Sequence, residues 1–520
     1  MPTGSLIFND VAFFYESSGE PVFDGLTAQF PQGWTGVIGA NGSGKTTLLR
    51  LACGDLRAAR GRIVTHDRVV YCPQRTDDPP SGLASFVEAA DHNAIVLRDR
   101  LGVDSEWVSV WPKLSHGERK RAQIAVALWR RPRVLALDEP TNHIDYDARR
   151  LLAESLRSFR GVGLLVSHDR DLLDALCSQC LFVAPPGAVM RPGGYSKSVA
   201  LADADQEQAR LAREQAKRDL KRLKDEAGDR RREADRAQHL RSKGRVARKD
   251  HDAKQHIGQA RYTSKDGQAG RLLRQMTGRL HQAQAKLAAI HATGRQRLGI
   301  ELQGVGARRN TLFDVPAISL ALGAQRCLMA GDLSMKPDDR VALVGPNGSG
   351  KSTLVRYIVS HLDLPADKVV YMPQEIDRST ARKIITDVRR LPDARLGGVM
   401  TVIDCLGSDP RRVLTTDQPS PGELRKIMLA LGIARRPNLI IMDEPTNHLD
   451  LPSIECLENA LDQVICGLLL VSHDMRFLRR LTWACWQIVP DPEEPSGSSL
   501  RVEIDHSPWC MSDTPDPTPR

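Results

Sequence analysis

The chain has 520 residues, of which 41% are apolar and 26% charged, enough for two or three globular domains that each bury a core. No run approaches the roughly 18 consecutive apolar residues of a membrane span, and Met1 to Glu16 lacks the basic start and apolar core of a signal peptide. We therefore expect a cytoplasmic protein. Among the ten cysteines only Cys177 and Cys180 form a close pair, which indicates buried free thiols rather than a zinc site.

A phosphate-binding pattern begins at Gly39, where residues 39–46 read GANGSGKT and match GxxxxGK[ST]. The segment before it, Thr35 to Ile38, is strand-like, and Thr47 to Cys53 can form a helix. Glycines let the backbone wrap phosphates, the lysine reaches the β and γ phosphates, and the hydroxyl after it ligates Mg²⁺. The predicted ATP phosphate-binding residues are Gly39, Asn41, Gly42, Gly44, Lys45, Thr46 and Thr47.

Two apolar segments follow that predict buried parallel strands. The first, Val134 to Leu137, ends in Asp138 and Glu139, and acids at the carboxyl end of such a strand lie beside the phosphate loop in a doubly wound sheet. We expect Asp138 to hold Mg²⁺ and Glu139 to polarise the attacking water. The second segment, Val162 to Val166, leads to His168 and places an imidazole at the same edge of the sheet.

Each of these elements returns later in the chain. Lys45 and Lys351 are 306 positions apart, and both the Asp138–Asp443 and the His168–His473 pairs are 305 apart. Chance matches would not keep this register, so the chain is a direct duplication. The second copy supplies the predicted catalytic residues Glu444 and His473, the predicted magnesium ligands Ser352 and Asp443, and the phosphate-binding residues Gly345, Asn347, Gly348, Gly350, Lys351, Ser352 and Thr353.

Residues 201–300 resemble neither copy. They carry 25 Lys and Arg against 13 Asp and Glu, a net charge of +12, whereas the rest of the chain carries 48 against 51, or −3. Apolar residues recur there at steps of three and four, which predicts two antiparallel helices that bury their seams against each other. A first helix of about 40 residues would extend roughly 60 Å. The seams are Ala216, Leu220, Leu223, Ala227, Ala234 and Ala237, then Leu273, Met276, Leu280, Ala283, Leu287 and Ile290.

The region between the two predicted helices is the most basic part of the hairpin. Tyr262 could stack on an unpaired base there. The alternative is a solvated coiled-coil spacer whose charges only maintain solubility. The candidate RNA-binding residues are Arg241, Lys243, Arg245, Arg248, Lys249, Lys254, Arg261 and Lys265.

Taken together, the motifs resemble an ABC-type ATPase. Gln74 and Gln374 each follow an aromatic and a proline, and the resemblance makes them further Mg²⁺ ligands. Tyr15 matches the position of an adenine-stacking aromatic, or it packs into the core. Segments that resemble the LSGGQ signature include Ser115, Gly117 and Glu118, then Ser420, Gly422 and Glu423.

In such proteins the signature of one cassette closes over ATP held by the other cassette. His116 stands where the signature usually has a small residue, and Pro419 and Pro421 flank the second signature serine. We therefore expect two ATP sites of unequal quality.

The wording EPTNHID at residues 139–145 and EPTNHLD at residues 444–450, with SHD after each last strand, is similar to the ABC-F family. The resemblance implies an α/β protein with two P-loop ABC ATPase cassettes joined by a long antiparallel α-helical hairpin linker. It also implies an ATPase that works as a monomer with head-to-tail cassettes. Its partner would be the ribosome, with its rRNA and tRNA, at the exit site, and the linker would point toward the peptidyl-transferase centre. The task would be translation control or antibiotic resistance.

The predicted domains are a first cassette at residues 1–200, the hairpin at 201–300, a second cassette at 301–492 and a Pro/Asp-rich tail at 493–520 with one strand-like piece, Leu500 to Ile504. A different class of function is a tandem-cassette ATPase that drives a membrane importer through separate spanning subunits. Such proteins have short linkers and no need for a basic hairpin. A DNA-repair ATPase of the same superfamily would need zinc-binding cysteine pairs, which this sequence lacks.

Overall fold

The computed structural model describes residues 5–16, 19–65, 68–142, 144–240, 265–289, 310–323, 326–406, 408, 410–416, 419–447, 449–490 and 499–505. It divides into two compact units. One unit comprises Met1–Ser198 and Gln296–Arg520 and holds both cassettes, and the other, Val199–Arg295, holds the helical hairpin.

The first cassette is built on a six-stranded sheet with the order β5-β6-β7-β3-β8-β9. Five strands are parallel and β9 pairs antiparallel with β8. Every residue of β6 and β7 is buried, as a parallel sheet with both faces covered requires. The strands are β3 (Gly33–Ile38), β5 (Val69–Cys72), β6 (Val134–Asp138), β7 (Val162–Val166), β8 (Cys177–Ala184) and β9 (Gly187–Pro192).

A separate antiparallel sheet of order β2-β1-β4 covers one side of this cassette's core. Its strands are β1 (Leu6–Phe14), β2 (Pro21–Phe30) and β4 (Arg60–Val64). Cys177 and Cys180 lie in β8 as buried free thiols, as predicted. The helices are α1 (Lys45–Cys53), α2 (Leu83–Glu88), α3 (His92–Leu101), α4 (His116–Trp129), α5 (Tyr146–Arg157) and α6 (Arg170–Leu176), with 3₁₀ turns at Ser105–Val108 and Trp111–Lys113.

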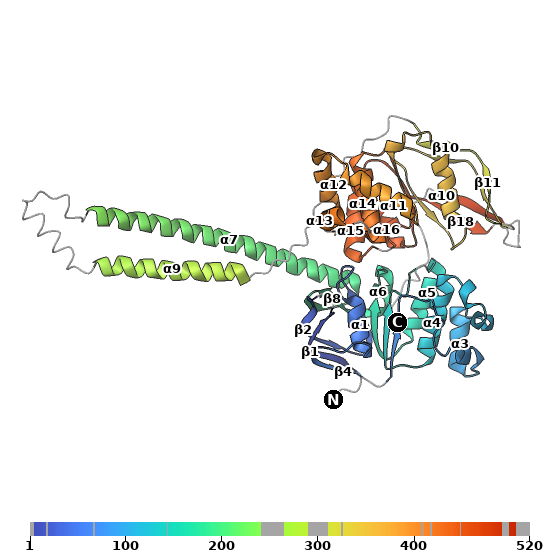
Figure 1. Cartoon of the computed structure of the whole chain (residues 1–520), viewed down its shortest axis with the longest axis horizontal. Helices are drawn as coiled ribbons and strands as arrows, with labels where there is room; N and C mark the ends of the chain where they lie inside the picture. The colour runs from blue at the N-terminus through green and yellow to red at the C-terminus, as the bar shows by residue number, and fades with distance from the viewer. Residues whose placement is uncertain are drawn as a thin grey trace, which may run out of the picture. The chain divides into compact units, whose positions relative to one another are not determined.

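The second cassette repeats this topology. Strands β15, β16, β17, β14 and β18 are parallel and follow the same order as their counterparts in the first cassette. The two-cassette α/β fold is therefore confirmed (Figure 1). The strands are β14 (Arg340–Val344), β15 (Val369–Met372), β16 (Leu439–Asp443), β17 (Gly467–Val471) and β18 (Ala484–Pro490).

The remaining strands differ from the first cassette. The sheet continues through β19 (Ser499–Asp505), which pairs antiparallel with β18 and parallel with β12 (Cys327–Ala330), to β11 (Ile318–Ala321). The segment that the sequence places in the tail thus contributes a strand inside an eight-stranded sheet, between β12 and β18. A two-stranded sheet joins β10 (Phe313–Val315) to β13 (Leu333–Met335).

The helices of the second cassette flank its sheet, as their positions in Figure 1 show. They are α10 (Lys351–Ser360), α11 (Arg378–Arg389), α12 (Asp393–Cys405), α13 (Pro410–Thr415), α14 (Pro421–Ala434), α15 (Leu451–Asp462) and α16 (Met475–Leu481), with a 3₁₀ turn at Ala366–Lys368.

The hairpin unit contains two long helices. They are α7 (Tyr195–Leu240), of 46 residues, and α9 (Lys265–Ala289), of 25 residues, and they run in opposite directions (Figure 1). Ala216, Leu223 and Met276 of the predicted seams are buried. At about 1.5 Å per residue, α7 spans about 70 Å.

The candidate RNA-binding residues from Arg241 to Arg261, with Tyr262, lie outside the described residues. Lys265 is the first residue of α9. None of the described helices has the length and apolarity that crossing a membrane requires, and no group of three or more His, Cys, Asp or Glu in the described ranges could hold a metal ion.

Candidate nucleotide sites

Each cassette holds its phosphate loop between a central strand and the next helix, β3 and α1 or β14 and α10. Gly44 and Gly350, which precede these helices, have φ values of 95° and 93°, a region that favours glycine. A Cβ atom on Gly44 would also lie 2.5 Å from Cγ1 of Val22. The loops therefore need glycine for conformation and for packing. The same two loops and helix starts contain Asn41, Gly42, Thr47, Asn347, Gly348 and Thr353.

The two phosphate-loop lysines are buried and are held by their own loops. Nζ of Lys45 donates to the carbonyl oxygen of Gly39 at 2.8 Å, and Nζ of Lys351 donates to Gly345 at 2.7 Å. Burial lowers the pKa of both lysines, and the nearby carboxylates oppose this shift. Each ammonium is thus held against its own phosphate loop. A positive charge beside the backbone N–H groups of such a loop is suited to binding phosphate.

A hydroxyl and a carboxylate meet at the start of each of these helices. Oγ1 of Thr46 donates to Oδ2 of Asp138 at 2.7 Å, and Ser352 hydrogen-bonds to Asp443. Burial raises the pKa of Asp443, while its bond with Ser352 acts in the opposite direction. Hydroxyl and carboxylate oxygens beside a phosphate loop are ligands that Mg²⁺ takes in proteins, so these residues fit the ion that the motifs predict.

Glu139 follows the end of β6 in a left-handed backbone conformation, with a φ of 48°. Its Oε2 accepts from the backbone N–H of His168 at 3.1 Å. Its Oε1 is buried, accepts no hydrogen bond from the described residues and lies 3.0 Å from Nε2 of His168. Burial raises the pKa of Glu139 to about 8 and lowers the pKa of His168 to about 4. Near neutral pH the imidazole is therefore uncharged, and this contact is not an ion pair.

Glu444 repeats the arrangement in the second cassette, with a φ of 52°. Its buried Oε1 lies 3.5 Å from Nε2 of His473 and has no hydrogen-bond partner in the part of the chain that the structure describes. Nε2 of His473 is 3.0 Å from Oδ1 of Asn347. Burial raises the pKa of Glu444 to about 7 and lowers that of His473 to about 3. A non-glycine residue in this backbone region costs about 1–3 kcal/mol, and both glutamates adopt it at the same position of the repeat.

The raised pKa values of Glu139 and Glu444 predict a pH-dependent stability. In the folded chain these carboxyls bind protons more tightly than in the unfolded chain, where they titrate near pH 4.5. Their contribution to stability is therefore present below that pH and is lost as the pH rises through about 7 and 8. Replacing both by Gln should raise the melting temperature of the nucleotide-free protein at pH 8, by about 2–4 °C per kcal/mol, and change it little at pH 5.

Thermal unfolding without nucleotide at the two pH values measures this difference. The histidines, whose lowered pKa values remove stability as the pH falls below 6.5, are the same in both proteins and cancel. An equal gain at both pH values would contradict the shifts of the two glutamates.

Each signature serine begins a helix. Ser115 is the N-cap of α4, where its Oγ accepts from the backbone N–H of Glu118 at 3.3 Å and its own N–H donates to Oε2 of Glu118 at 2.7 Å. Ser420 and Glu423 form the same capping box at the start of α14. The spacing S-x-x-E predicts such a box.

The signature of the first cassette shares a cavity with the phosphate loop of the second. The cavity has a volume of about 860 Å³, within the range of ligand sites in proteins. It is lined from the first cassette by Ser115, His116, Gly117 and Arg149, and from the second mainly by Asn347, Gly348, Gly350, Lys351, Ser352, Thr353, Gln374, Asp443, Glu444, Asn447 and His473. A reciprocal contact reaches the first phosphate loop, where the N–H of Asn41 donates to Oδ2 of Asp450 at 2.8 Å.

Other predicted residues lie near these loops. The hydroxyl of Tyr15 is 2.8 Å from Oγ1 of Thr47 in α1, and its ring is 38% exposed, so it is not a core residue. His116 turns its ring to Thr76, with Nδ1 3.1 Å from Oγ1. Gln74 is exposed. Leu322 lines the second-cassette cavity, at the aliphatic stretch that replaces an aromatic there.

Two buried cations were not predicted. Nζ of Lys120 in α4 donates to the carbonyl oxygen of Pro73 at 2.6 Å, and its counterpart Arg425 in α14 donates to that of Glu444 at 2.6 Å and also to that of Gln374. Each joins the segment of the motif glutamine to the carboxylate strand, Lys120 through a second bond to the carbonyl oxygen of Asp138 at 3.4 Å. The signal in the sequence was a cation 305 positions after Lys120, in the same turn of both signature helices.

Comparisons with known proteins agree with this geometry. A family model described as "ABC transporter" matches residues 23–142 and again residues 328–447. The ribosome protection protein VmlR of Bacillus subtilis (strain 168) is 27% identical over 482 residues, which cover 90% of this chain and 84% of that protein. The mouse (Mus musculus) ATP-binding cassette sub-family F member 2 is 28% identical over 393 residues, which cover 72% of this chain and 56% of that protein.

Among solved structures, an archaeal ribosome recycling factor, aABCE1, in complex with the ribosomal stalk protein aP1, superposes with a TM-score of 0.59. The match covers 95% of this chain and 89% of that one, at 18% identity. At that identity the likeness concerns the fold alone. The chain hydrolyses ATP in two ABC cassettes, and its repeated motifs, helical linker and relatives show that it belongs to the ABC-F family.

Proposed function

We propose that ATP-driven closure of the two cassettes lets this protein act on the ribosome in the cytoplasm, as a monomer. It would enter the exit site with the hairpin toward the peptidyl-transferase centre, in translation control or in protection from an antibiotic. The observation that carries the proposal is the combination of two ATPase cassettes with a long helical hairpin in a segment of net charge +12. The name of the relative VmlR, a ribosome protection protein, supports the same reading.

The roles that we propose for the site residues rest on the motifs and are supported by the contacts described above. Lys45 and Lys351 hold the β and γ phosphates, and Ser115 and Ser420 close over them from the opposite cassette. Mg²⁺ would be held by Thr46, Asp138 and Gln74 in the first cassette and by Ser352, Asp443 and Gln374 in the second, where it would neutralise phosphate charge when bound.

Catalysis is proposed for the carboxylates. Glu139 and Glu444 polarise the attacking water with their unpartnered Oε1 atoms, and His168 and His473 hold these carboxylates in place. Tyr15 would stack on adenine beside α1.

Co-sedimentation with ribosomes tests the proposal. The variant with Gln in place of both Glu139 and Glu444 should stay loaded with ATP and sediment with ribosomes at low salt. If the eight basic residues between the helices contact RNA phosphates, affinity should fall by about 10³-fold between 50 and 200 mM salt, because bound cations release counterions. A variant with Ala at Lys45 and Lys351, which cannot hold ATP phosphates, is the control and should not sediment.

Deleting residues 243–265 tests whether the hairpin acts on the ribosome or is only a spacer. Such a chain should still bind ATP but lose its effect on translation. Unchanged translation after the deletion would make the hairpin a spacer. If the variant with Gln at positions 139 and 444 failed to bind ribosomes at low salt and bound a membrane fraction, the alternative function as an ATPase subunit of a membrane importer would be favoured.

A further inference from the structure

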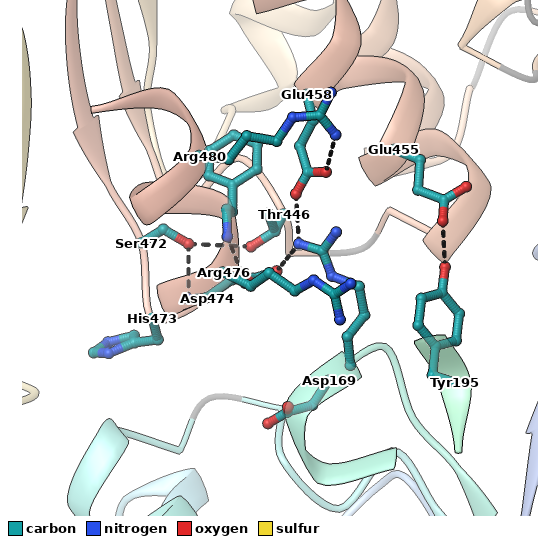
Figure 2. Close-up of polar contacts among 12 residues, drawn as sticks. Asp169, Tyr195, Thr446, Glu455, Glu458, Ser472, His473, Asp474, Arg476 and Arg480 are labelled. Atoms are coloured by element: carbon teal, nitrogen blue, oxygen red, sulfur yellow. Dashed lines mark hydrogen bonds and ion pairs between the residues drawn. The ribbon is translucent and has the colours of Figure 1, made fainter. Parts of the chain in front are cut away.

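The segment from Ser472 to Asp474, here called the His473 loop, connects β17 to α16 in the second cassette. Oγ of Ser472 is 3.3 Å from Oγ1 of Thr446 and accepts from the backbone N–H of Asp474 at 3.1 Å. Figure 2 shows these contacts beside His473. Oδ1 of Asp474 also accepts from the N–H of Phe477 and so caps α16. The loop is therefore held on one side from within its own cassette, where His473 also contacts Asn347 through its ring at 3.0 Å and Glu444 through its backbone N–H.

Two arginines of the first cassette hold the other side of the His473 loop. Nη1 of Arg149, from α5, donates to the carbonyl oxygen of His473 at 3.1 Å. Nη2 of Arg170, the first residue of α6, donates to Oδ2 of Asp474 at 3.1 Å. Arg149 is itself anchored, because its Nε donates to the carbonyl oxygen of Ile144 at 2.9 Å. Adjacent residues of one loop are thus both bound by cations of the opposite cassette.

Arg170 is deeply buried, with 4% of its side chain exposed. Its Nη2 also donates to Oε1 of Glu458 in α15 at 2.5 Å, and Glu458, 2% exposed, accepts from Arg480 at 3.1 Å (Figure 2). Burial alone would lower the pKa of Arg170, but the bonds to Glu458 and the attraction of Asp474 raise it above its ordinary value. The guanidinium thus forms charge-assisted hydrogen bonds with two carboxylates of the second cassette, Glu458 and Asp474.

The repeat shows that this arrangement is one-sided. At the spacing of 305 residues, Arg149 corresponds to Ile454, Arg170 to Met475, and Glu458 to Ala153. The second cassette therefore offers two apolar residues where the first offers two cations. A cavity of about 410 Å³ adjoins both loops, and its lining includes Arg149, His473 and Asp474 as well as His168, Ile454 and Met475. Nδ1 of His168 is buried and has no hydrogen-bond partner among the described residues.

We propose that Arg149 and Arg170 of the first cassette are positioning residues for His473, so that hydrolysis in the second-cassette site depends on contact with the first cassette. The inference rests on the proposed roles of Glu444 and His473. The loop that carries His168 lacks the equivalent support from the second cassette, because the residues at the equivalent positions, Ile454 and Met475, are apolar. The two sites therefore differ in how they are controlled, in addition to the differences in their signatures.

Site-resolved trapping of nucleotide tests this asymmetry in the full chain. The protein is incubated with Mg²⁺, 8-azido-ATP and vanadate, irradiated, and digested, so that labelled peptides are assigned to one cassette or the other. Arg170→Met introduces the residue found at the equivalent position of the repeat. It should reduce trapping in the second cassette at least tenfold and change trapping in the first cassette less than twofold. Arg149→Ile should also reduce the second label, but its effect on the first label does not discriminate, because Nη1 of Arg149 lies 3.7 Å from Oδ2 of Asp169 beside His168.

Matched controls distinguish the loss of His473 positioning from a general destabilisation of the protein. Arg476→Met removes another arginine that crosses between the cassettes, where it contacts Asp174, but it lies outside the His473 loop and should leave both labels unchanged. Arg170→Lys keeps the charge and should restore part of the second label. Arg170→Met with Glu458→Leu removes the buried carboxylate that would otherwise lose its main partner, and should still show the selective loss.

Three results would overturn the proposal. The first two are equal losses of trapped nucleotide in both cassettes, and no loss for Arg170→Met. The third is recovery of the second label in the double variant, because recovery would mean that only the unpaired charge of Glu458 had reduced trapping. A wild-type protein that trapped nucleotide in neither cassette would overturn the site assignments themselves, and the positioning role with them. That failure is distinct because it precedes any change at Arg170.

Discussion

Replacing Glu139 and Glu444 together by Gln should lower the rate of ATP hydrolysis by about 10²–10⁴-fold, the usual contribution of a general base. An amide cannot take a proton from the attacking water, and each of these glutamates has a buried Oε1 without a hydrogen bond from any described residue. The change removes an interaction made in the transition state, while Lys45 and Lys351 stay in place to bind the ground state. ATP-loaded protein should therefore accumulate.

Phosphate release and equilibrium binding of labelled ATP measure the two effects separately. Glu154→Gln, which changes an exposed carboxylate of α5, is the control and should hydrolyse ATP at the normal rate. A double variant at Glu139 and Glu444 that hydrolysed ATP as fast as this control would show that the catalytic carboxylates lie elsewhere.

Ser115→Arg should weaken nucleotide binding more than tenfold in the site that contains Lys351 and leave the site that contains Lys45 occupied. Ser115 lines the 860 Å³ cavity with Lys351, so a long side chain there fills the space for the γ-phosphate. Ser420→Arg should give the opposite pattern. Each change also removes an N-cap, at a cost of about 1 kcal/mol, which is too little to unfold a cassette.

The measurement is nucleotide occupancy resolved by cassette, obtained from photolabelled peptides at low ATP concentration. Ser115→Thr and Ser420→Thr keep a capping hydroxyl and serve as matched controls with nearly normal occupancy. If each arginine emptied the site of its own cassette, the sites would not be shared between the cassettes.

The sequence predicted the central sheets well because their pattern is local. Strands with both faces covered must be apolar at every position, and β6 and β7 occupy the predicted segments with at most one further residue. The spacing of the repeat then predicts the corresponding strands of the second cassette, where β16 and β17 are likewise fully buried. The assignment of the motif residues to loops and helix starts followed from these strands.

Contacts between distant segments could not be predicted in this way. Arginines are mostly exposed in proteins. Nothing adjacent to Arg170 in the sequence indicates that it is buried in an ion pair with Glu458, 288 residues away. Lys120 was missed for the same reason, since its partners are backbone carbonyls, which carry no sequence signal. The strand β19 was recognised as strand-like, but its partners, β12 and β18, were not.

The pairing of β19 with β12 bears on the order in which the chain folds. The first cassette completes its main sheet with the β8–β9 hairpin, which ends at Pro192. The sheet of the second cassette needs Leu500 beside Leu328, a separation of 172 residues. Long-range pairing of this kind is slow, and domains near the N-terminus fold first during synthesis. The second cassette should therefore acquire its native sheet last, and until then the edges of β12 and β18 stay open to pairing with other chains.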